Sequence, residues 1–436
     1  MNAQQTPGEL WAALPADSRD VCERAAVIAE ALGQRLFLVG GSVRDLLLGQ
    51  APTDLDLVVE GDAARLAEAL AKELGGELRP PSQFLTAQIE LPDGRRIDVA
   101  TARQETYPEP GKLPVVAPAG LADDLRRRDF SINAIALELS AAGGVELADP
   151  CGGREDLAAG RVRVLHEASF RDDPTRLIRA ARFTRRLGSQ LEARTAALLA
   201  KAAADGLLDG VSGARVRQEV VKLLGEPSPT AVLDDLAAMG LLEQALPGVR
   251  YDRQARAWLA GSAAALIALR GMWRETPEAW PYRLAALAAR GEAGRTSRRL
   301  DLSAEAAGAL EAATEAARSP LPAVLLERGG VSGARLHRAL GGIAPAGLMV
   351  HWLRSAAVGR RRLEWHVAQR RPAQAVVRGD ALLAAGAPPG PAVRVGLEAA
   401  REAWLDGRVG HDEQAQAALA AIREWQRPAR RARRTG

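Results

Sequence analysis

The sequence is poor in cysteine and histidine, and these shortages exclude several kinds of site. Cys22 and Cys151 are the only cysteines in 436 residues, which leaves neither a disulfide framework nor a zinc cluster. The five histidines are scattered without the spacing of metal ligands. Catalysis must therefore rest on carboxylates and arginines.

Long hydrophobic runs are also missing. No stretch approaches the roughly 20 apolar residues of a membrane-spanning helix. The opening residues, MNAQQTPGELWAALPADSRD, lack the basic and then apolar segments of a signal peptide. These absences predict a cytoplasmic protein with no membrane partner.

Lysine is scarce as well, so nearly all of the 58 basic residues are arginine. A GC-rich genome accounts for most of this bias. The net charge of +4 permits a nucleic-acid partner without requiring one. With 47% hydrophobic and 26% charged residues, the composition is that of an ordinary soluble protein, long enough for about two to four domains.

Residues 36–59, LFLVGGSVRDLLLGQAPTDLDLVV, form the segment around which the chain is organised. The apolar start is typical of a buried strand, Gly40 and Gly41 predict a sharp turn, and residues 43–48 have the composition of a helix. Such a turn lets backbone N–H groups approach an anion, and the helix start and Arg44 add positive charge. The pattern predicts a phosphate cradle, although Gly-Gly before a helix is more often only a tight turn.

Two aspartates follow in an extended pattern. Asp54 and Asp56 alternate with Leu55 and Leu57, so a period of two places both carboxylates on one face of a strand. A solvated strand face is the usual explanation, but repulsion between close carboxylates and the cradle upstream favour Mg²⁺. Asp98 lies in a second strand pattern, and three strand carboxylates beside a phosphate-binding turn suit two-metal phosphoryl transfer.

These motifs carry a resemblance. Gly40-Gly-Ser-Val-Arg-Asp45, followed by Asp54-Leu-Asp56, resembles the signature of the polymerase-β-type nucleotidyltransferases, in particular the family of class II tRNA nucleotidyltransferases and bacterial poly(A) polymerases. The resemblance implies that Asp54 and Asp56 hold Mg²⁺. It also implies that Gly41 and Arg44 hold the triphosphate and that Asp98 is the third catalytic carboxylate.

Residues 127–134 match a second motif of this family, Arg-Arg-Asp-Phe-x-x-Asn-Ala. Three arginines in a row are otherwise typical of a solvated face or of an anion contact, and the spacing does not decide between them. The resemblance implies that Arg128 binds the triphosphate and that Asp129 and Asn133 contact the ribose.

A third motif lies at the start of a predicted helix, where four charged residues recur every three positions: Asp173, Arg176, Arg179 and Arg182. An ordinary acid-to-base helix explains the order of signs but not the spacing. A carboxylate accepts from the amine of cytosine or adenine while an arginine donates to the adjacent ring acceptor. The stripe resembles the family's base-selecting Asp-x-x-Arg motif, which implies this role for Asp173 and Arg176, with Arg179 and Arg182 as further nucleotide contacts.

The coarse pattern predicts an α+β fold, in which a small mixed sheet with helices behind it is followed by an almost wholly helical chain. We expect a helix over 10–35, a helix capped by Asp62 and ending at Gly75-Gly76, a hairpin over 84–101 and a loop over 104–122. With the resemblance, the predicted domains are a catalytic head (1–150), a base-recognising neck (151–225), a helical body (226–330) and a tRNA-binding tail (331–436).

The resemblance implies an enzyme that adds C and A nucleotides to the 3′ end of tRNA from CTP and ATP. A CC-adding enzyme, an A-adding enzyme and a poly(A) polymerase are the alternatives, and the first two are not separable from one sequence. Poly(A) polymerases of the family tend to carry Arg-Arg-Phe before the third carboxylate. Here residues 82–88 read Ser-Gln-Phe-Leu-Thr-Ala-Gln, which counts against a poly(A) polymerase. A non-catalytic RNA-binding protein ranks lower because both metal carboxylates are present. The sequence leaves the oligomeric state open.

Overall fold

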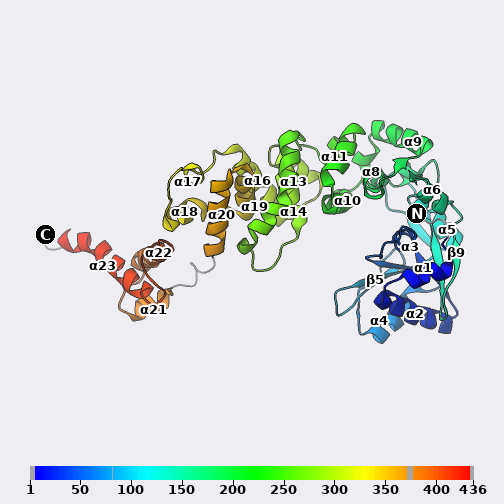
Figure 1. Cartoon of the computed structure of the whole chain (residues 1–436), viewed down its shortest axis with the longest axis horizontal. Helices are drawn as coiled ribbons and strands as arrows, with labels where there is room; N and C mark the ends of the chain where they lie inside the picture. The colour runs from blue at the N-terminus through cyan, green and yellow to red at the C-terminus, as the bar shows by residue number, and fades with distance from the viewer. Residues whose placement is uncertain (1–4, 81, 371–376, 433–436) are drawn as a thin grey trace. The chain divides into compact units, whose positions relative to one another are not determined.

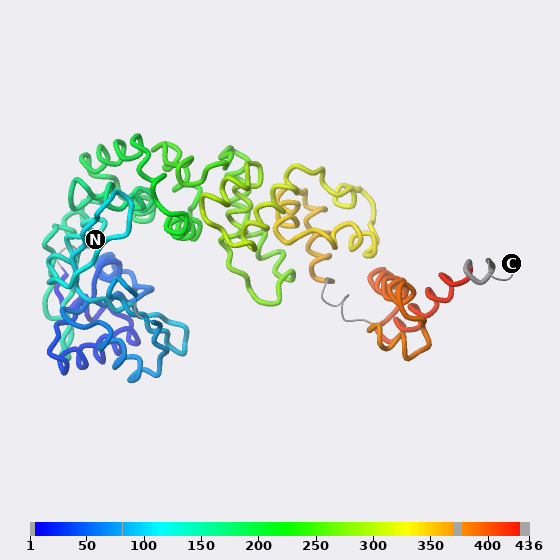
Figure 2. The backbone as a smooth tube through the Cα atoms, turned by 180° about the vertical axis from the view of Figure 1, so that it is seen from behind, coloured from blue at the N-terminus to red at the C-terminus, as the bar shows by residue number. Residues whose placement is uncertain are grey.

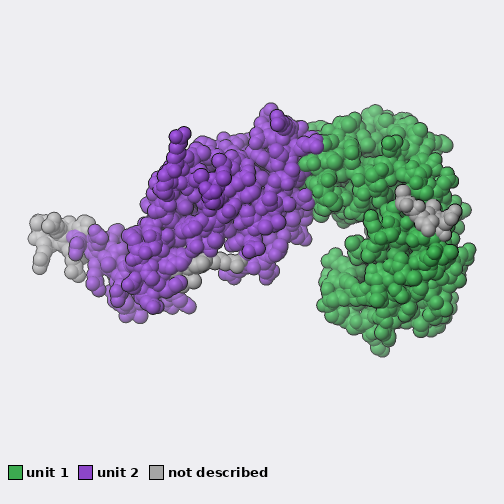
Figure 3. Space-filling model, in the orientation of Figure 1, with its two compact units in different colours: residues 1–245 green, residues 246–436 purple. Residues whose placement is uncertain are grey.

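The computed structural model describes residues 5–80, 82–370 and 377–432. The chain divides into two compact units, residues 1–245 and 246–436, which Figure 3 colours separately. Every residue of the predicted site falls within the first unit. The finer boundaries at 150, 225 and 330 stay predictions.

A seven-stranded mixed sheet forms the head of the first unit (Figure 1). Its strand order is β3-β4-β5-β2-β1-β8-β9, with β2 and β5 parallel and the other neighbours antiparallel. Two small sheets, β6–β7 and β10–β11, lie outside it. The strands are β1 (Arg35–Val39), β2 (Leu55–Glu60), β3 (Glu77–Leu78), β4 (Thr86–Glu90), β5 (Arg96–Thr101), β6 (Arg103–Thr106), β7 (Val115–Pro118), β8 (Ala136–Ser140), β9 (Gly143–Ala148), β10 (Arg161–Val162) and β11 (Gln190–Leu191).

The helices of the first unit pack first on this sheet, and after β11 the unit contains only helices, in agreement with the predicted α+β class. They are α1 (Pro7–Ala13), α2 (Ala16–Ala31), α3 (Gly41–Leu47), α4 (Ala63–Leu74), α5 (Leu121–Arg126), α6 (Gly153–Ala158), α7 (Ser169–Asp172), α8 (Thr175–Leu187), α9 (Ala193–Ala204), α10 (Gly213–Gly225), α11 (Pro229–Ala238) and α12 (Leu242–Ala245), with 3₁₀ turns η1 (Ser131–Asn133) and η2 (Leu207–Gly210).

The central strand β1 has a packed layer on each face. On the face that carries the site, Phe37 and Val39 pack with Leu121 and Leu125 of α5. Helices α2 and α4 pack on the sheet from the other side, with Leu66 and Leu70 of α4 fully buried. Side chains therefore alternate between two cores along the strand, which holds its register firmly.

Of two helices predicted in the head, one is confirmed and one is wrong. The Asp62 side chain accepts from the backbone N–H groups of residues 64 and 65, and Gly75 ends α4 in the left-handed conformation, as predicted. The single helix over 10–35 is wrong, because Leu14 is extended (ψ 135°) and separates α1 from α2. Pro15 is the cause, since the residue before a proline is disfavoured in helical conformation.

The predicted loop over 104–122 is also wrong in part. Strands β6 and β7 pair as an antiparallel hairpin, so only its tip, residues 107–114, and residues 119–120 are irregular, and α5 has begun by residue 121. The prolines and glycines that suggested a loop lie in the tip, at the end of β7 or, for Gly120, at the N-cap of α5. The predicted hairpin over 84–101 is confirmed by the antiparallel pair β4 and β5.

The second unit is helical throughout its described residues. Helices α13, α14, α16 and α19 pack against one another and are seen as one group in Figures 1 and 2. The helices are α13 (Arg253–Ala268), α14 (Ala279–Ala288), α15 (Ala293–Arg299), α16 (Ala304–Arg318), α17 (Ala323–Leu326), α18 (Gly333–Leu340), α19 (Pro345–Arg354), α20 (Ala357–Arg370), α21 (Gly379–Ala384), α22 (Pro391–Leu405) and α23 (Gln414–Ala432), with η3 (Arg270–Met272). Within the described parts of the chain, no helix has the length and apolar character to cross a membrane.

Candidate active site

The turn between β1 and α3 has the backbone of an anion cradle. Gly40 adopts φ +67°, which disfavours any residue with a Cβ, and an added Cβ would lie 2.7 Å from Nη1 of Arg128. The sequence singled out Gly41, but the constraint falls on Gly40. Arg44, only 3% exposed, donates to the Asp45 carboxylate (2.7 Å) and to Oδ1 of Asn133 (2.6 Å).

Ser42 holds the aspartate pair against this turn. Its hydroxyl donates to the backbone carbonyl of Asp54 (2.8 Å) and accepts from the backbone N–H of Asp56 (3.3 Å). Leu55 and Leu57 point into the opposite core, as the period of two predicts. The two carboxylates are thereby presented beside the cradle.

Asp98 lies directly beside Asp56, because β2 and β5 are parallel and these residues are register partners. Gln88 on β4 donates to Oδ1 of Asp98 (2.8 Å). Burial raises the pKa of the Asp56 carboxyl, Arg128 and Arg44 offset part of the rise, and the charges of Asp98 and Asp54 add to it. Three carboxylates thus gather at this point of the sheet, and burial is the main reason that the charged form of Asp56 is disfavoured.

These carboxylates suit Mg²⁺. Within the part of the chain that the structure describes, no hydrogen bond donor reaches the Asp56 carboxylate, and Asp54 receives only the Thr53 hydroxyl (3.3 Å). Among the same residues no group of three or more acidic, cysteine or histidine side chains forms a metal cage. Mg²⁺ commonly binds one or two carboxylates together with substrate phosphates, so this donor set fits it.

A buried aspartate that the sequence analysis missed holds the arginine run. Asp124 on α5 is fully buried and accepts from Arg127 (2.5 Å) and Arg128 (2.9 Å). Burial alone would raise the pKa of the Asp124 carboxyl, but these two guanidinium groups lower it. Asp124 precedes them by three and four residues, a helical spacing that would have revealed the pairing.

A second network joins the head to α8. Asn133 donates to Oδ1 of Asp129 (3.0 Å), and Arg179 donates to Oδ2 of Asp129 (2.9 Å) and to Glu219 (3.3 Å). Burial alone would raise the pKa of the Asp129 carboxyl, but Arg179 and Asn133 hold it well below its usual range. Arg44, Asn133, Asp129 and Arg179 therefore form one continuous chain of contacts.

The predicted base-selecting pair lies at the start of α8. Arg176, 4% exposed, donates to the Ser169 hydroxyl (2.6 Å) and to the backbone carbonyl of Arg127 (2.8 Å). Asp173 accepts through Oδ1 from the backbone of Thr175 (3.0 Å), as a helix cap does. The pair is thus fixed both to its own helix and to the arginine run of the head.

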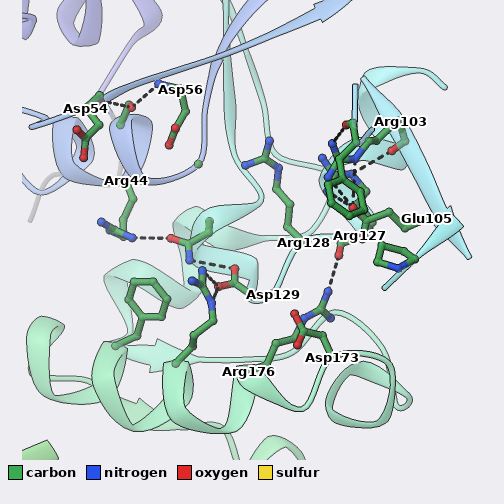
Figure 4. A pocket seen from close by; sticks show the side chains of 18 of the residues that line it. Arg44, Asp54, Asp56, Arg103, Glu105, Arg127, Arg128, Asp129, Asp173 and Arg176 are labelled. Atoms are coloured by element: carbon green, nitrogen blue, oxygen red, sulfur yellow. Dashed lines mark hydrogen bonds and ion pairs between the residues drawn. The ribbon is translucent and has the colours of Figure 1, made fainter. Parts of the chain in front are cut away.

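These groups share one cavity of about 520 Å³, shown in Figure 4. Asp54 and Asp56 lie on one side, Asp173 and Arg176 on another, and Arg128 and Asp129 between them. Ten of the twelve predicted residues line it: Gly41, Arg44, Asp54, Asp56, Arg128, Asp129, Asn133, Asp173, Arg176 and Arg179.

The other two predicted residues lie outside this cavity. Asp98 lines a neighbouring cavity, which shares Asp56 and Arg128 with it. Arg182 is 5% exposed and faces Glu219 (3.3 Å) and Glu226 within the helical layer. Lining residues that the sequence analysis did not assign include Glu105, Tyr107, Phe183 and Arg215.

The chain matches two family models. Residues 36–163 match the poly A polymerase head domain, and residues 188–252 match the probable RNA and SrmB-binding site of polymerase A. These are the head sheet with its arginine run and the helices that follow α8.

Among curated proteins, the chain is 40% identical over 238 residues to the A-adding tRNA nucleotidyltransferase of Halalkalibacterium halodurans, a match that covers 54% of this chain and 56% of that protein. It is 42% identical over 241 residues to the CC-adding tRNA nucleotidyltransferase of Deinococcus radiodurans, covering 54% of this chain and 62% of that protein. The match thus spans less than two thirds of these relatives.

Among solved structures, the fold resembles that of a CCA-adding enzyme in an apo form. The TM-score is 0.74 at 28% sequence identity, and the superposition covers 93% of this chain and 96% of that one. The likeness to this structure extends well beyond the part shared with the two curated relatives.

Proposed function

Because this chain belongs to the family of the class II tRNA nucleotidyltransferases and bacterial poly(A) polymerases, we propose that it adds C and A nucleotides to the 3′ end of tRNA from CTP and ATP. The observation that carries the proposal is the single cavity that joins an anion cradle, a pair of aspartates and an Asp–Arg pair. The cradle suits the phosphates of a nucleoside triphosphate, the aspartate pair suits the Mg²⁺ that accompanies them, and the Asp–Arg pair suits the base.

In the proposed reaction the RNA 3′-hydroxyl attacks the α-phosphate of the nucleotide, and pyrophosphate leaves. Asp54 and Asp56 would hold Mg²⁺, which supplies charge neutralisation and activates the hydroxyl. The backbone N–H of Gly40 donates to the carbonyl of Ile135, so the N–H groups that would orient the phosphates are those from Gly41 onward, at the start of α3. Arg128 faces the same space and would stabilise the charge that develops on the departing pyrophosphate.

Base choice would rest on Asp173 and Arg176. A carboxylate acceptor beside an arginine donor matches the edges of cytosine and adenine, whereas uracil and guanine place a carbonyl where the amine would be. The mismatch leaves two acceptors face to face and costs binding. Selection in this form needs no nucleic-acid template.

The test is incorporation of labelled CTP and ATP, separately and together, into tRNAs that end at the discriminator base, after C and after CC. Addition of all three nucleotides supports a complete CCA-adding enzyme. Asp54→Ala and Asp56→Ala are expected to abolish transfer while sparing tRNA binding. Retained transfer in either variant would contradict the metal assignment.

A divided activity is the second candidate, because the two curated relatives described above are an A-adding and a CC-adding enzyme. Stalling after CC, or activity only on tRNA that already ends in CC, would identify one half of such a pair. Repeated addition of A to RNA other than tRNA would identify a poly(A) polymerase. The tail, residues 331–436, is proposed to bind the body of the tRNA.

A further inference from the structure

Arg215, in the first turn of α10, connects two parts of the first unit that are distant in sequence. Its Nη2 donates to Oδ1 of Asp173 (2.6 Å), and its Nη1 donates to the backbone carbonyl of Gly111 (2.6 Å). One guanidinium fork thus holds the Asp173 carboxylate and the tip of the β6–β7 hairpin at once. Its side chain is 20% exposed and lines the cavity.

The hairpin tip is fitted to this contact. Gly111 is buried with φ +72°, and its backbone N–H donates to the carbonyl of Arg171 (3.2 Å). A Cβ added there would contact Val211 (3.5 Å) and Pro174 (3.7 Å), which stand at the starts of α10 and α8. The tip is therefore seated between the two helices that carry Arg215 and Asp173.

The contact also gives the two carboxylate oxygens of Asp173 different surroundings. Oδ1 accepts from Arg215, from the Thr175 backbone and from the Thr175 hydroxyl (2.6 Å), so its lone pairs are fully used. Among the described residues no donor reaches Oδ2. The carboxylate is locked by one oxygen and presents the other to the cavity.

From this arrangement we infer that Arg215 is a specificity-positioning residue, which fixes the direction of Asp173 Oδ2 toward the exocyclic amine of CTP or ATP and ties that direction to the seating of Gly111. The inference rests on the proposed function, since it assigns Asp173 to the base edge. Arg215 does not itself need to touch the nucleotide.

The experiment compares binding of CTP and of UTP, by calorimetry without RNA, in the wild-type protein and in Arg215→Ala. Freed from Arg215, Asp173 can rotate, and we expect the CTP-over-UTP preference to fall roughly tenfold, the loss that one charge-assisted hydrogen bond gives. Arg215→Lys, which keeps the charge but reaches only one acceptor well, is expected to give an intermediate preference.

Arg185→Ala is the matched control. It also removes one guanidinium and one arginine–aspartate pair from the first unit, since Arg185 pairs with Asp235 (2.5 Å) outside the cavity. We expect its nucleotide preference to be unchanged. A purely structural role for Arg215 would weaken CTP and UTP binding alike and leave their ratio at the wild-type value, which would overturn the inference.

A double-mutant cycle tests whether Arg215 acts through its partner. In an Asp173→Ala background, Arg215→Ala is expected to change the CTP-to-UTP ratio no further. An equal further change in that background would overturn the inference. Thermal unfolding of each variant confirms that the comparison is made on folded protein.

The two readouts separate the inference from the proposed function. Transfer to tRNA tests the proposed reaction, whereas the binding ratio is measured without RNA. Absence of transfer together with an Arg215-dependent preference would contradict the reaction and support the inference. Transfer to tRNA together with an unchanged CTP-to-UTP ratio in Arg215→Ala would support the reaction and contradict the inference.

Discussion

At the scale of single residues, Asp56 combines a catalytic position with an unfavourable charge. Its pKa is raised by burial and by its acidic neighbours, so the ionised carboxylate destabilises the fold at neutral pH. Asp56→Asn removes that charge. In metal-free buffer at pH 7 we expect the variant to melt about 2 °C higher than the wild type, the shift that ~1 kcal/mol gives in a large domain.

Added Mg²⁺ should reverse this order, because an ion that binds only the folded protein stabilises it by mass action. The wild type is expected to gain in melting temperature with Mg²⁺ and Asp56→Asn to gain little. Asp20→Asn, a change of an aspartate on α2 that pairs with Arg24, is the control and should respond like the wild type. Equal Mg²⁺ responses in all three proteins would contradict a cation site at Asp56.

Asp129 behaves in the opposite way. Its pKa is held low in the folded protein, so the carboxylate contributes stability that is present above the ordinary pKa of 3.8 and is lost as the pH falls below it. Asp129→Asn leaves Arg179 with a weaker buried partner and is expected to cost about 3 kcal/mol at neutral pH. Urea unfolding at pH 7, 5 and 3 should show a constant difference between the first two values and a smaller one at the third.

The sequence allowed the charged residues of the cavity to be predicted where a motif carried them. Asp173 and Arg176 could be paired from their spacing, because both lie at the start of one helix. Arg215 could not be joined to Gly111, since that contact spans 104 residues and depends on how the hairpin tip is seated. Arg182 follows Arg179 by three residues, yet the rotation around α8 directs it away from Asp129 and toward Glu219 and Glu226, so it lies outside the cavity.

At the scale of elements, the turn from β1 to α3 is fixed by one glycine. Gly40→Ala places a Cβ at positive φ and against the guanidinium of Arg128, which must move away. We expect a loss of about 1 kcal/mol in stability from the backbone strain and a larger loss in nucleotide binding from the displaced arginine. Calorimetry with CTP and thermal unfolding measure the two effects separately.

Gly49→Ala is the comparison for that variant. Gly49 has a similar φ of +73°, but nothing lies within 4 Å of an added Cβ. It should lose stability in the same way and keep its affinity for CTP. Equal losses of affinity in the two variants would show that backbone strain, rather than Arg128, explains the effect of Gly40→Ala.

Elements were predictable where local rules and tertiary packing agree. The capped helix α4 and the pair β4–β5 follow from capping and turn residues alone. Strands β6 and β7 were not predicted, because the prolines and glycines around them are typical of a loop. Glu105 of β6 forms ion pairs with Arg103 on the same strand and with Arg127 just after α5. Such contacts leave no periodic pattern in the sequence.

At the scale of the whole molecule, the two units should respond to acid over different ranges. In the second unit, burial and then Arg354 lower the pKa of His351 from 6.5 to about 4. Between pH 6.5 and pH 4 His351 is protonated in the unfolded chain but stays neutral in the folded unit. The free energy of unfolding therefore falls as the pH drops from 6.5 towards 4. We expect a loss of about 2 kcal/mol between pH 7 and pH 5.

Tryptophan fluorescence reports mainly on the unfolding of the second unit, because seven of the eight tryptophans lie in it and only Trp11 lies outside it. His351→Gln should remove most of the loss in urea unfolding, and the exposed His411→Gln should leave it intact. A wild-type stability that is unchanged between pH 7 and pH 5 would contradict a neutral, buried His351.

The span of the cavity along the chain also bears on how the protein is made. Its walls come from residues 40 to 215, and its contacts include Arg44 with Asn133, 89 positions apart, and Arg215 with Gly111. Such distant closures are slow relative to helix formation. During synthesis the ribosome must release residue 215 before the pocket can close, so no shorter nascent chain can hold a nucleotide in the complete site, and a transcript cut within the first half yields no partially active fragment.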